Sequence, residues 1–266
     1  MKPLLTVIAV ALTIAPAQAT SVVFRVDGKR ILIAADNRNG EIDNACKIRK
    51  VGRTIVSFSG TVAHSRGRTD WDALGDAHTA MAKFGDNPGQ LGTGWAATTG
   101  KNIATYAARI GPGSAMQELT SFRGNMVCEA LFFGWAFGLP SSRFEGLTLN
   151  PDGHVTISGY DVPPSGGIER SLNDISQELI DCKTKRAKDT ARRWTAASVK
   201  LPKSERVWRH LQFIIQETSK YDQSVSRDSD VIEVLPSGAA VWLSRSLCPE
   251  FPKAAPSPMP AHPSHR

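Results

Sequence analysis

The stretch SVVFRVDGKRILIAADNR, residues 21–38, decides the fold that the sequence predicts. Two runs rich in β-branched and aliphatic residues, SVVFRV and RILIAA, flank the triplet Asp27-Gly28-Lys29. An Asp-Gly turn between two such runs is typical of a β-hairpin. We therefore expect two antiparallel strands here, with the folded domain beginning at about residue 20.

The residues before this hairpin have the pattern of an export signal. Residues 1–19 contain Lys2, an apolar run from Leu4 to about Ala15, and the triplet Ala17-Gln18-Ala19. A positive start, a short apolar run and an A-x-A site predict a secretory signal peptide that is cleaved before Thr20. We therefore expect a periplasmic or secreted protein that has no membrane attachment after cleavage.

The remaining chain alternates between segments with strand patterns and segments with helix patterns. Hairpins and buried strands are expected at 46–60, 125–136, 144–158 and 231–244, and helices at 69–84, about 95–110 and across 168–220, with 85–94 as a loop. The long helical region is expected to break near Cys182 and at Leu201-Pro202. Runs of strands separated from runs of helices predict a layered α+β domain over residues 20–247. The proline-rich residues 248–266 are expected to form a disordered tail.

Charge and cysteine content narrow the class of protein. The formal net charge is +7, and the basic residues are spread along the chain apart from one cluster at 183–193. This cluster alternates with Asp189 and alanines, which indicates a solvated helix face and no nucleic-acid partner. No CxxC or HExxH spacing is present, so no metal site is expected. The sequence leaves all three pairings open for its four cysteines: Cys46, Cys128, Cys182 and Cys248.

A chain that begins at Thr20 has a hydroxyl and a free α-amine on the same residue. The α-amine has an ordinary pKa of about 7.7 to 8.0, whereas that of a lysine amine is about 10.4. The α-amine is therefore able to act as a general base at neutral pH, and Thr20 is a candidate for both nucleophile and base.

The segment TSVVFRVDGKRILIAADNR resembles the start of mature proteasome β subunits and their bacterial HslV-type relatives, in which a Thr precedes a hairpin that ends in V-A-A-D-x-R. Thr20, Asp36 and Arg38 have the spacing of that family, and Lys47 and the segment SFSG, which ends at Gly60, follow. The resemblance implies a four-layer αββα sandwich, in which two antiparallel sheets lie between helix layers. It also implies that Lys47 tunes Thr20, Asp36 holds Lys47, and the Gly60 N–H faces an oxyanion.

The resemblance continues less closely towards the end of the chain. The family has an aspartate sixteen residues before a turn glycine, and this position matches Asp222. Three residues after this aspartate the family has a site serine; this chain has Val225 there, with Ser224 and Ser226 on either side. Another serine of that site should fall in VPPSGG, where Ser165 supplies the hydroxyl in a shifted register. These residues are the expected supporting network.

Two further features bear on specificity. Phe58 is at the position that in the family forms the floor of the first side-chain pocket, although a core role is equally consistent with the sequence. Residues 183–203 form a basic insertion that the family lacks.

The resemblance implies a threonine-type N-terminal-nucleophile hydrolase that cleaves an amide or peptide bond without a cofactor. Its expected partners are a peptide or small amide substrate and, in a homo-oligomer, other copies of the chain. Two alternatives stay open at this point: a small-molecule amidase or acylase with the same fold, and a catalytically inactive binding protein.

Overall fold

The computed structural model describes residues 21–26, 28–39, 42–43, 46–65, 69–120, 124–163, 167, 169–245 and 248. The first hairpin is as predicted: β1 (Val22–Val26) and β2 (Ile31–Asp36) are antiparallel. Both strands are almost completely buried. The opening hairpin is therefore at the centre of the domain.

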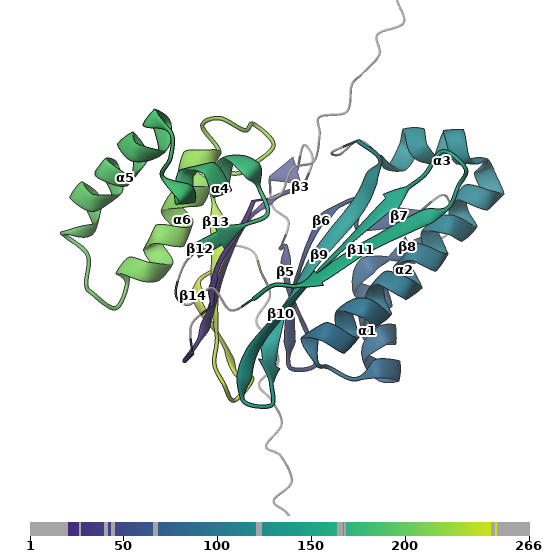
Figure 1. The fold of residues 1–266 in the computed structure, drawn as a ribbon, viewed down its shortest axis with the longest axis horizontal. Coiled ribbons are helices and arrows are strands. Elements are labelled where there is room, and N and C mark those ends of the chain that lie inside the picture. Colours follow the sequence, from purple (N-terminus) through teal and green to yellow (C-terminus); the bar gives the residue numbers. More distant parts are fainter. Residues whose placement is uncertain are drawn as a thin grey trace, which may run out of the picture.

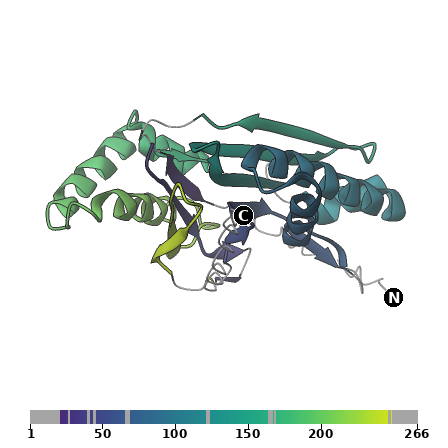
Figure 2. The ribbon, with the colours of Figure 1, turned by 90° about the horizontal axis from the view of Figure 1, so that it is seen from below.

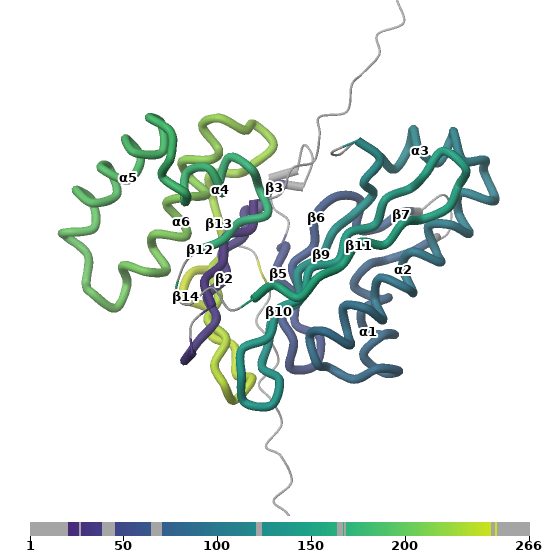
Figure 3. Tube along the Cα trace, in the orientation of Figure 1, coloured from purple at the N-terminus to yellow at the C-terminus, as the bar shows by residue number. Residues whose placement is uncertain are grey.

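Two five-stranded antiparallel sheets form the body of the protein. The first sheet has the order β12-β1-β2-β13-β14, and the second β11-β10-β9-β6-β5. In Figure 3, β2 and β13 lie side by side although they come from opposite ends of the chain. The remaining strands of the first sheet are β12 (Glu169–Ser171), β13 (Ser229–Val234) and β14 (Ala240–Ser244). Those of the second are β5 (Ile48–Val51), β6 (Thr54–Gly60), β9 (Met126–Ala136), β10 (Leu139–Leu149) and β11 (Val155–Asp161).

Two short strand pairs and six helices complete the described residues. The pairs are β3 (Arg38–Asn39) with β4 (Ile42–Asp43), and β7 (Ala63–Ser65) with β8 (Thr69–Asp72). One helix group comprises α1 (Ala73–Phe84), α2 (Pro88–Ile110) and α3 (Pro112–Leu119). The other comprises α4 (Asp174–Asp181), α5 (Lys185–Ser198) and α6 (Arg206–Thr218).

The prediction of a loop at 85–94 is wrong, because α2 begins at Pro88. The Asn87 side chain accepts a hydrogen bond from the Gly89 N–H at 3.0 Å, and proline suits the first helical position. The helix also continues through Gly100, which packs closely against the side chains of Val155 and Ile157 on β11. Tertiary packing therefore overrides the low helix propensity of this glycine.

The apolar residues form three clusters that separate four layers. On β2, Ile31 and Ile33 lie between the two sheets, whereas Leu32 faces α4 and α6. On β9, Leu131 lies between the sheets and Phe132 packs on the side of α1 to α3. Figure 1 shows the resulting order of helix layer, sheet, sheet and helix layer. The predicted α+β, four-layer αββα sandwich is therefore confirmed.

The edge strand β12 is attached to its neighbours by charged side chains. Glu169 lies 3.1 Å from His210 Nδ1 on α6 and 3.5 Å from Arg25 Nη1 on β1. Burial by itself raises the pKa of Glu169, but the hydrogen bond and charge of His210, together with Arg25, bring it below the ordinary value. The ionised carboxylate therefore helps to hold β12 in place.

A disulfide joins Cys46 to Cys248, with 4.7 Å between their α-carbons. Cys248 was expected to begin the tail, but it is buried in the cluster between the sheets and so belongs to the domain. Within the part of the chain that the structure describes, Cys128 and Cys182 are not in disulfides. The predicted signal peptide and residues 249–266 lie outside the described residues. None of the described helices has the length and apolar character needed to cross a membrane.

Candidate active site

A buried ion pair lies where the first hairpin ends. Lys47 Nζ is 3.0 Å from Asp36 Oδ1 and 3.1 Å from Oδ2. Asp36 is 0% exposed and Lys47 8% exposed. Asp36 is the last residue of β2, and Lys47 immediately precedes β5, so the pair joins the two sheets. The structure brings together the two residues that the family resemblance paired.

Three backbone N–H groups also donate to the Asp36 carboxylate. They belong to Ser21 at 2.7 Å, Arg38 at 3.1 Å and Ser226 at 3.2 Å. Ser21 immediately precedes β1, Arg38 begins β3, and Ser226 lies in the loop before β13. Charged acceptors make the strongest hydrogen bonds in proteins, so one carboxylate fixes three chain segments.

Burial shifts the pKa of both members of the pair. It raises the pKa of Asp36, while the Lys47 ammonium and the backbone donors oppose that shift. It lowers the pKa of Lys47, an effect that Asp36 opposes and the nearby Arg38 charge strengthens. Lys47 therefore releases its proton more readily than an exposed lysine does. Such a perturbed group is typical of functional sites, although structural ion pairs also produce it.

The loop that follows α6 lies next to this pair. Asp222 accepts hydrogen bonds from Asn173 Nδ2 at 3.1 Å, from the Ser224 N–H at 3.0 Å and from Ser224 Oγ. Its negative charge opposes the burial that lowers the pKa of Lys47. Ser226 reaches Asp36 through its backbone, while its Oγ accepts from the Asp228 N–H at 3.1 Å. The two serine side chains therefore organise the loop.

Arg38 has a similar positioning role. Its backbone N–H donates to Asp36, and its guanidinium Nη1 donates to the carbonyl oxygen of Gln223. The residue thus ties the end of the first hairpin to the loop that contains Asp222.

Gly60 ends β6 with a backbone conformation that requires glycine. Its φ is +83°, and a β-carbon at this position would lie 2.4 Å from the Val127 carbonyl oxygen. The Thr61 N–H donates to that oxygen at 2.8 Å. Because bonded and non-bonded pairs alternate in an antiparallel ladder, the Gly60 N–H is directed to the β5 side of β6. On that side β5 begins only at Ile48, opposite Ser57.

Phe58 has the contacts of a core residue. Its ring lies 5.8 Å from that of Trp95 on α2, within the cluster that covers the second sheet on its helix side. The sequence left two interpretations open for Phe58, a pocket floor and a core residue, and these contacts are those of a core residue. Thr20 and Ser165 lie outside the described residues.

The sequence did not identify a chain of hydroxyls behind Ser21. Ser21 Oγ is 2.7 Å from Ser176 Oγ on α4, which is 2.7 Å from Thr218 Oγ1 on α6. Asn173, which holds Asp222, also caps α4 by accepting from the N–H groups of Ile175 and Ser176. An Asn before a helical run is a recognisable cap signal, but the hydroxyl contacts have no signature in the sequence.

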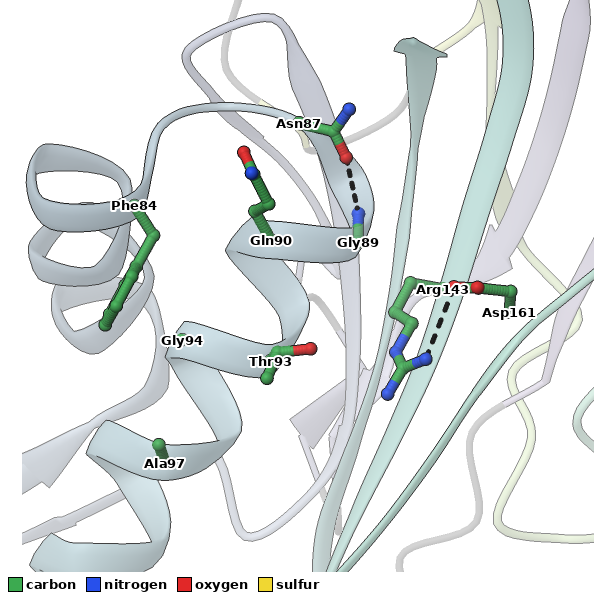
Figure 4. A pocket seen from close by; sticks show the side chains of 9 residues that line it. All are labelled: Phe84, Asn87, Gly89, Gln90, Thr93, Gly94, Ala97, Arg143 and Asp161. Carbon is green, nitrogen blue, oxygen red and sulfur yellow. Dashed lines mark hydrogen bonds and ion pairs between the residues drawn. The ribbon is translucent and has the colours of Figure 1, made fainter.

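The cavity with a volume of about 670 Å³ lies away from these residues. Figure 4 shows it beside α2, with Phe84 on one side and the ion pair of Arg143 and Asp161 on the other. Its lining includes none of the residues that surround Asp36 and Lys47. The described residues contain no group of three or more His, Cys, Asp or Glu side chains that could hold a metal ion. The candidate site is therefore identified by its buried charges and hydrogen bonds.

Comparison with known proteins found similarity to solved structures only. No family model and no curated protein sequence matches this chain. Among solved structures, it is similar to Anbu (ancestral beta-subunit) from Yersinia bercovieri, with 14% identity and a TM-score of 0.47 over 86% of this chain and 88% of that one. At this identity the likeness concerns the fold alone. The roles of residues are therefore argued from the geometry above.

Proposed function

We propose that this protein is an N-terminal-nucleophile hydrolase that cleaves amide or peptide bonds, with Thr20 as the nucleophile. The observation that carries the proposal is the 2.7 Å hydrogen bond from the Ser21 N–H to Asp36, which is itself paired with Lys47. The nitrogen of Ser21 is bonded to the carbonyl carbon of residue 20. A nucleophile at residue 20 would therefore be one peptide unit from a buried carboxylate and ammonium.

Strand alternation supports the same placement. Val22 and Phe24 face the space between the sheets, whereas Val23 faces the helices α4 and α6. If the alternation continues by two residues, the side chain of residue 20 is on the face of Val22. Consecutive α-carbons are about 3.8 Å apart, so this side chain would be beside the end of the hairpin that holds Asp36.

The proposed reaction uses Thr20 in two roles. The α-amine accepts the hydroxyl proton as Oγ bonds to the substrate carbonyl carbon. The tetrahedral intermediate then collapses, the C–N bond breaks, and the amine product leaves with that proton. Water, deprotonated by the same α-amine, attacks the acyl ester on Oγ, and the acid is released with the Thr20 hydroxyl restored.

The neighbouring residues would stabilise the charges of this reaction. The Lys47 ammonium would favour the alkoxide of Thr20 and lower the pKa of the α-amine. Asp36 would hold Lys47, and Asp222 would add a second negative charge nearby. The Gly60 N–H, directed towards the side of β6 where β5 has not yet begun, would donate to the oxyanion.

The proposal includes activation by export. Cleavage after Ala19 would free the α-amine of Thr20 in the periplasm or outside the cell. Any residue left before Thr20 would convert that amine into an amide, which is not a base.

Intact-mass spectrometry of the exported protein, with and without an electrophilic β-lactone, tests processing and reactivity together. The expected result is a chain that begins at Thr20 and gains one adduct on that residue. Thr20→Ala should abolish the adduct and lower hydrolysis by about three orders of magnitude or more. Thr195→Ala, on the exposed side of α5, is a matched control that should still form the adduct and hydrolyse substrate at the normal rate. A mature chain with another first residue, or an unmodified Thr20, would refute the proposal.

The substrate class is a separate question, because the fold supports many amide hydrolyses. A panel of fluorogenic peptides and small acyl amides should separate a peptidase from an amidase. If the protein hydrolyses neither group of substrates and Thr20→Ala leaves every measured activity unchanged, the protein is a binding protein and the proposal is wrong.

A further inference from the structure

The net charge of the protein is concentrated in one short segment. Residues 181–209 contain ten Lys and Arg against three Asp and Glu, a formal charge of +7. The whole chain has 32 Lys and Arg against 25 Asp and Glu, which is also +7. The rest of the chain therefore has equal numbers of acidic and basic residues. The segment comprises α5, the turn after it and the start of α6.

Helix α5 lies at the outer edge of its layer. It packs on α4 and α6 and is the element furthest from the second sheet in Figures 1 and 2. Its inner face contains Ala187 and Thr190, which are buried, and Trp194, whose ring lies 4.8 Å from that of His210 and 5.3 Å from that of Phe213. The helix is thus anchored by one side only.

The opposite side of α5 forms an exposed basic row. Lys185, Lys188, Arg192 and Val199 follow one another at steps of three, four and seven residues, so they share one helix face. Val199 caps the helix with helical backbone angles and is 72% exposed. At 1.5 Å per residue the row is about 21 Å long.

The charges of this row are not used to hold the domain together. On other faces of α5, Arg186 contacts Glu178, and Arg193 lies 2.6 Å from Glu217. Within the outward row, Arg192 has a solvent-exposed ion pair with a neighbour on its own helix. Among the described residues, no ion pair involves either lysine of the row. Lys200 and Lys203, in the turn that follows, extend the basic surface.

We propose that this basic face, defined by Lys185, Lys188, Arg192 and Val199, docks on an anionic phospholipid surface, which differs from the expectation that the cleaved protein has no membrane attachment. The argument is charge complementarity on a straight helix face that is open to solvent along its length. A lipid surface, in addition, accepts an apolar side chain beside its anionic headgroups. Val199 is placed to enter the boundary between the headgroups and the acyl chains, while the cations contact the lipid phosphates.

A nucleic acid fits the same face less well. Proteins that hold single strands place aromatic rings against the bases, in addition to a basic groove. Trp194 is the sole aromatic residue of α5, and its ring is turned towards His210 and Phe213. The exposed apolar residue of the row is a valine, which has no ring to stack on a base.

Sedimentation of the mature chain with vesicles tests the proposal, with phosphatidylcholine alone or with about one third phosphatidylglycerol. Each cation near such a surface contributes about 1 kcal/mol, which is about fivefold in partitioning. The triple variant Lys185→Gln, Lys188→Gln, Arg192→Gln should therefore bind on the order of 100-fold more weakly to the anionic vesicles. Its fold is checked by its thermal melting curve.

A matched control removes the same charge from the opposite helix layer, with Lys83→Gln, Lys101→Gln and Arg109→Gln. It should lose much less binding than the α5 variant. Val199→Ser should weaken the binding that persists at high salt, where electrostatic attraction is screened.

Three results would overturn the proposal. They are equal binding to neutral and anionic vesicles, equal loss in the α5 and control variants, and tighter α5-dependent binding to DNA than to anionic vesicles. None of these measurements depends on hydrolase activity.

Discussion

The two members of the buried ion pair should differ in their importance for stability. Asp36 accepts hydrogen bonds from three backbone N–H groups in addition to the Lys47 ammonium, which donates to both of its carboxylate oxygens. Asp36→Asn leaves a buried ammonium without its counter-charge, which costs about 3 to 5 kcal/mol. Lys47→Met leaves a carboxylate that still accepts three hydrogen bonds, so we expect a smaller loss of about 1 to 3 kcal/mol.

Urea unfolding of the mature chain, followed by tryptophan fluorescence, measures these free energies. The double variant should lose at least about 2 kcal/mol less than the sum of the single variants, because each single change leaves the other charge buried. The exposed ion pair of Arg53 with Asp86 is a control, and Asp86→Asn should cost less than about 1 kcal/mol. If Lys47→Met is as costly as Asp36→Asn, or the two effects add, the asymmetric role given to Asp36 is wrong.

Three other predictions concern the cysteines and the edge strand. Replacing Cys46 and Cys248 by serine opens a loop that spans 202 residues and should lower the free energy of unfolding by about 3 to 5 kcal/mol, and an unchanged urea midpoint would contradict this. Burial raises the pKa of the Cys128 thiol, so a maleimide should modify native protein at Cys182 and reach Cys128 only after unfolding, as peptide mass mapping would report. The lowered pKa of Glu169 gives stability that is present above the carboxyl's ordinary pKa of about 4.5 and is lost as pH falls through the folded value. The stability difference between wild type and Glu169→Gln should therefore shrink as the pH is lowered from 6 towards the acid limit of folding, and a constant difference would refute the assignment.

Local signals in the sequence were sufficient for most elements. The Asp-Gly turn predicted the first hairpin because its backbone preference acts within a few residues. The breaks near Cys182 and at Leu201-Pro202 separate α4, α5 and α6 as expected. The glycines of 85–94 are typical of a loop, but the cap at Asn87 starts α2 at Pro88.

The candidate site could be predicted only in part. The family resemblance implied that Asp36 holds Lys47, and the structure places the two side chains within hydrogen-bond distance. The contacts of Ser21 with Ser176, and of Asn173 with Asp222, join positions that are 155 and 49 residues apart. Such contacts depend on how the layers pack, which has no local signature.

The sequence by itself determined most of the elements, because strand alternation, turns and caps are set by neighbours along the chain. Tertiary structure alone decided the pairing of Cys46 with Cys248 and the direction of Phe58. Both faces of β6 are buried. Its hydrophobic pattern therefore cannot tell which face meets the helices and which meets the other sheet. That choice is made when the two sheets pack, and it placed Phe58 in the core.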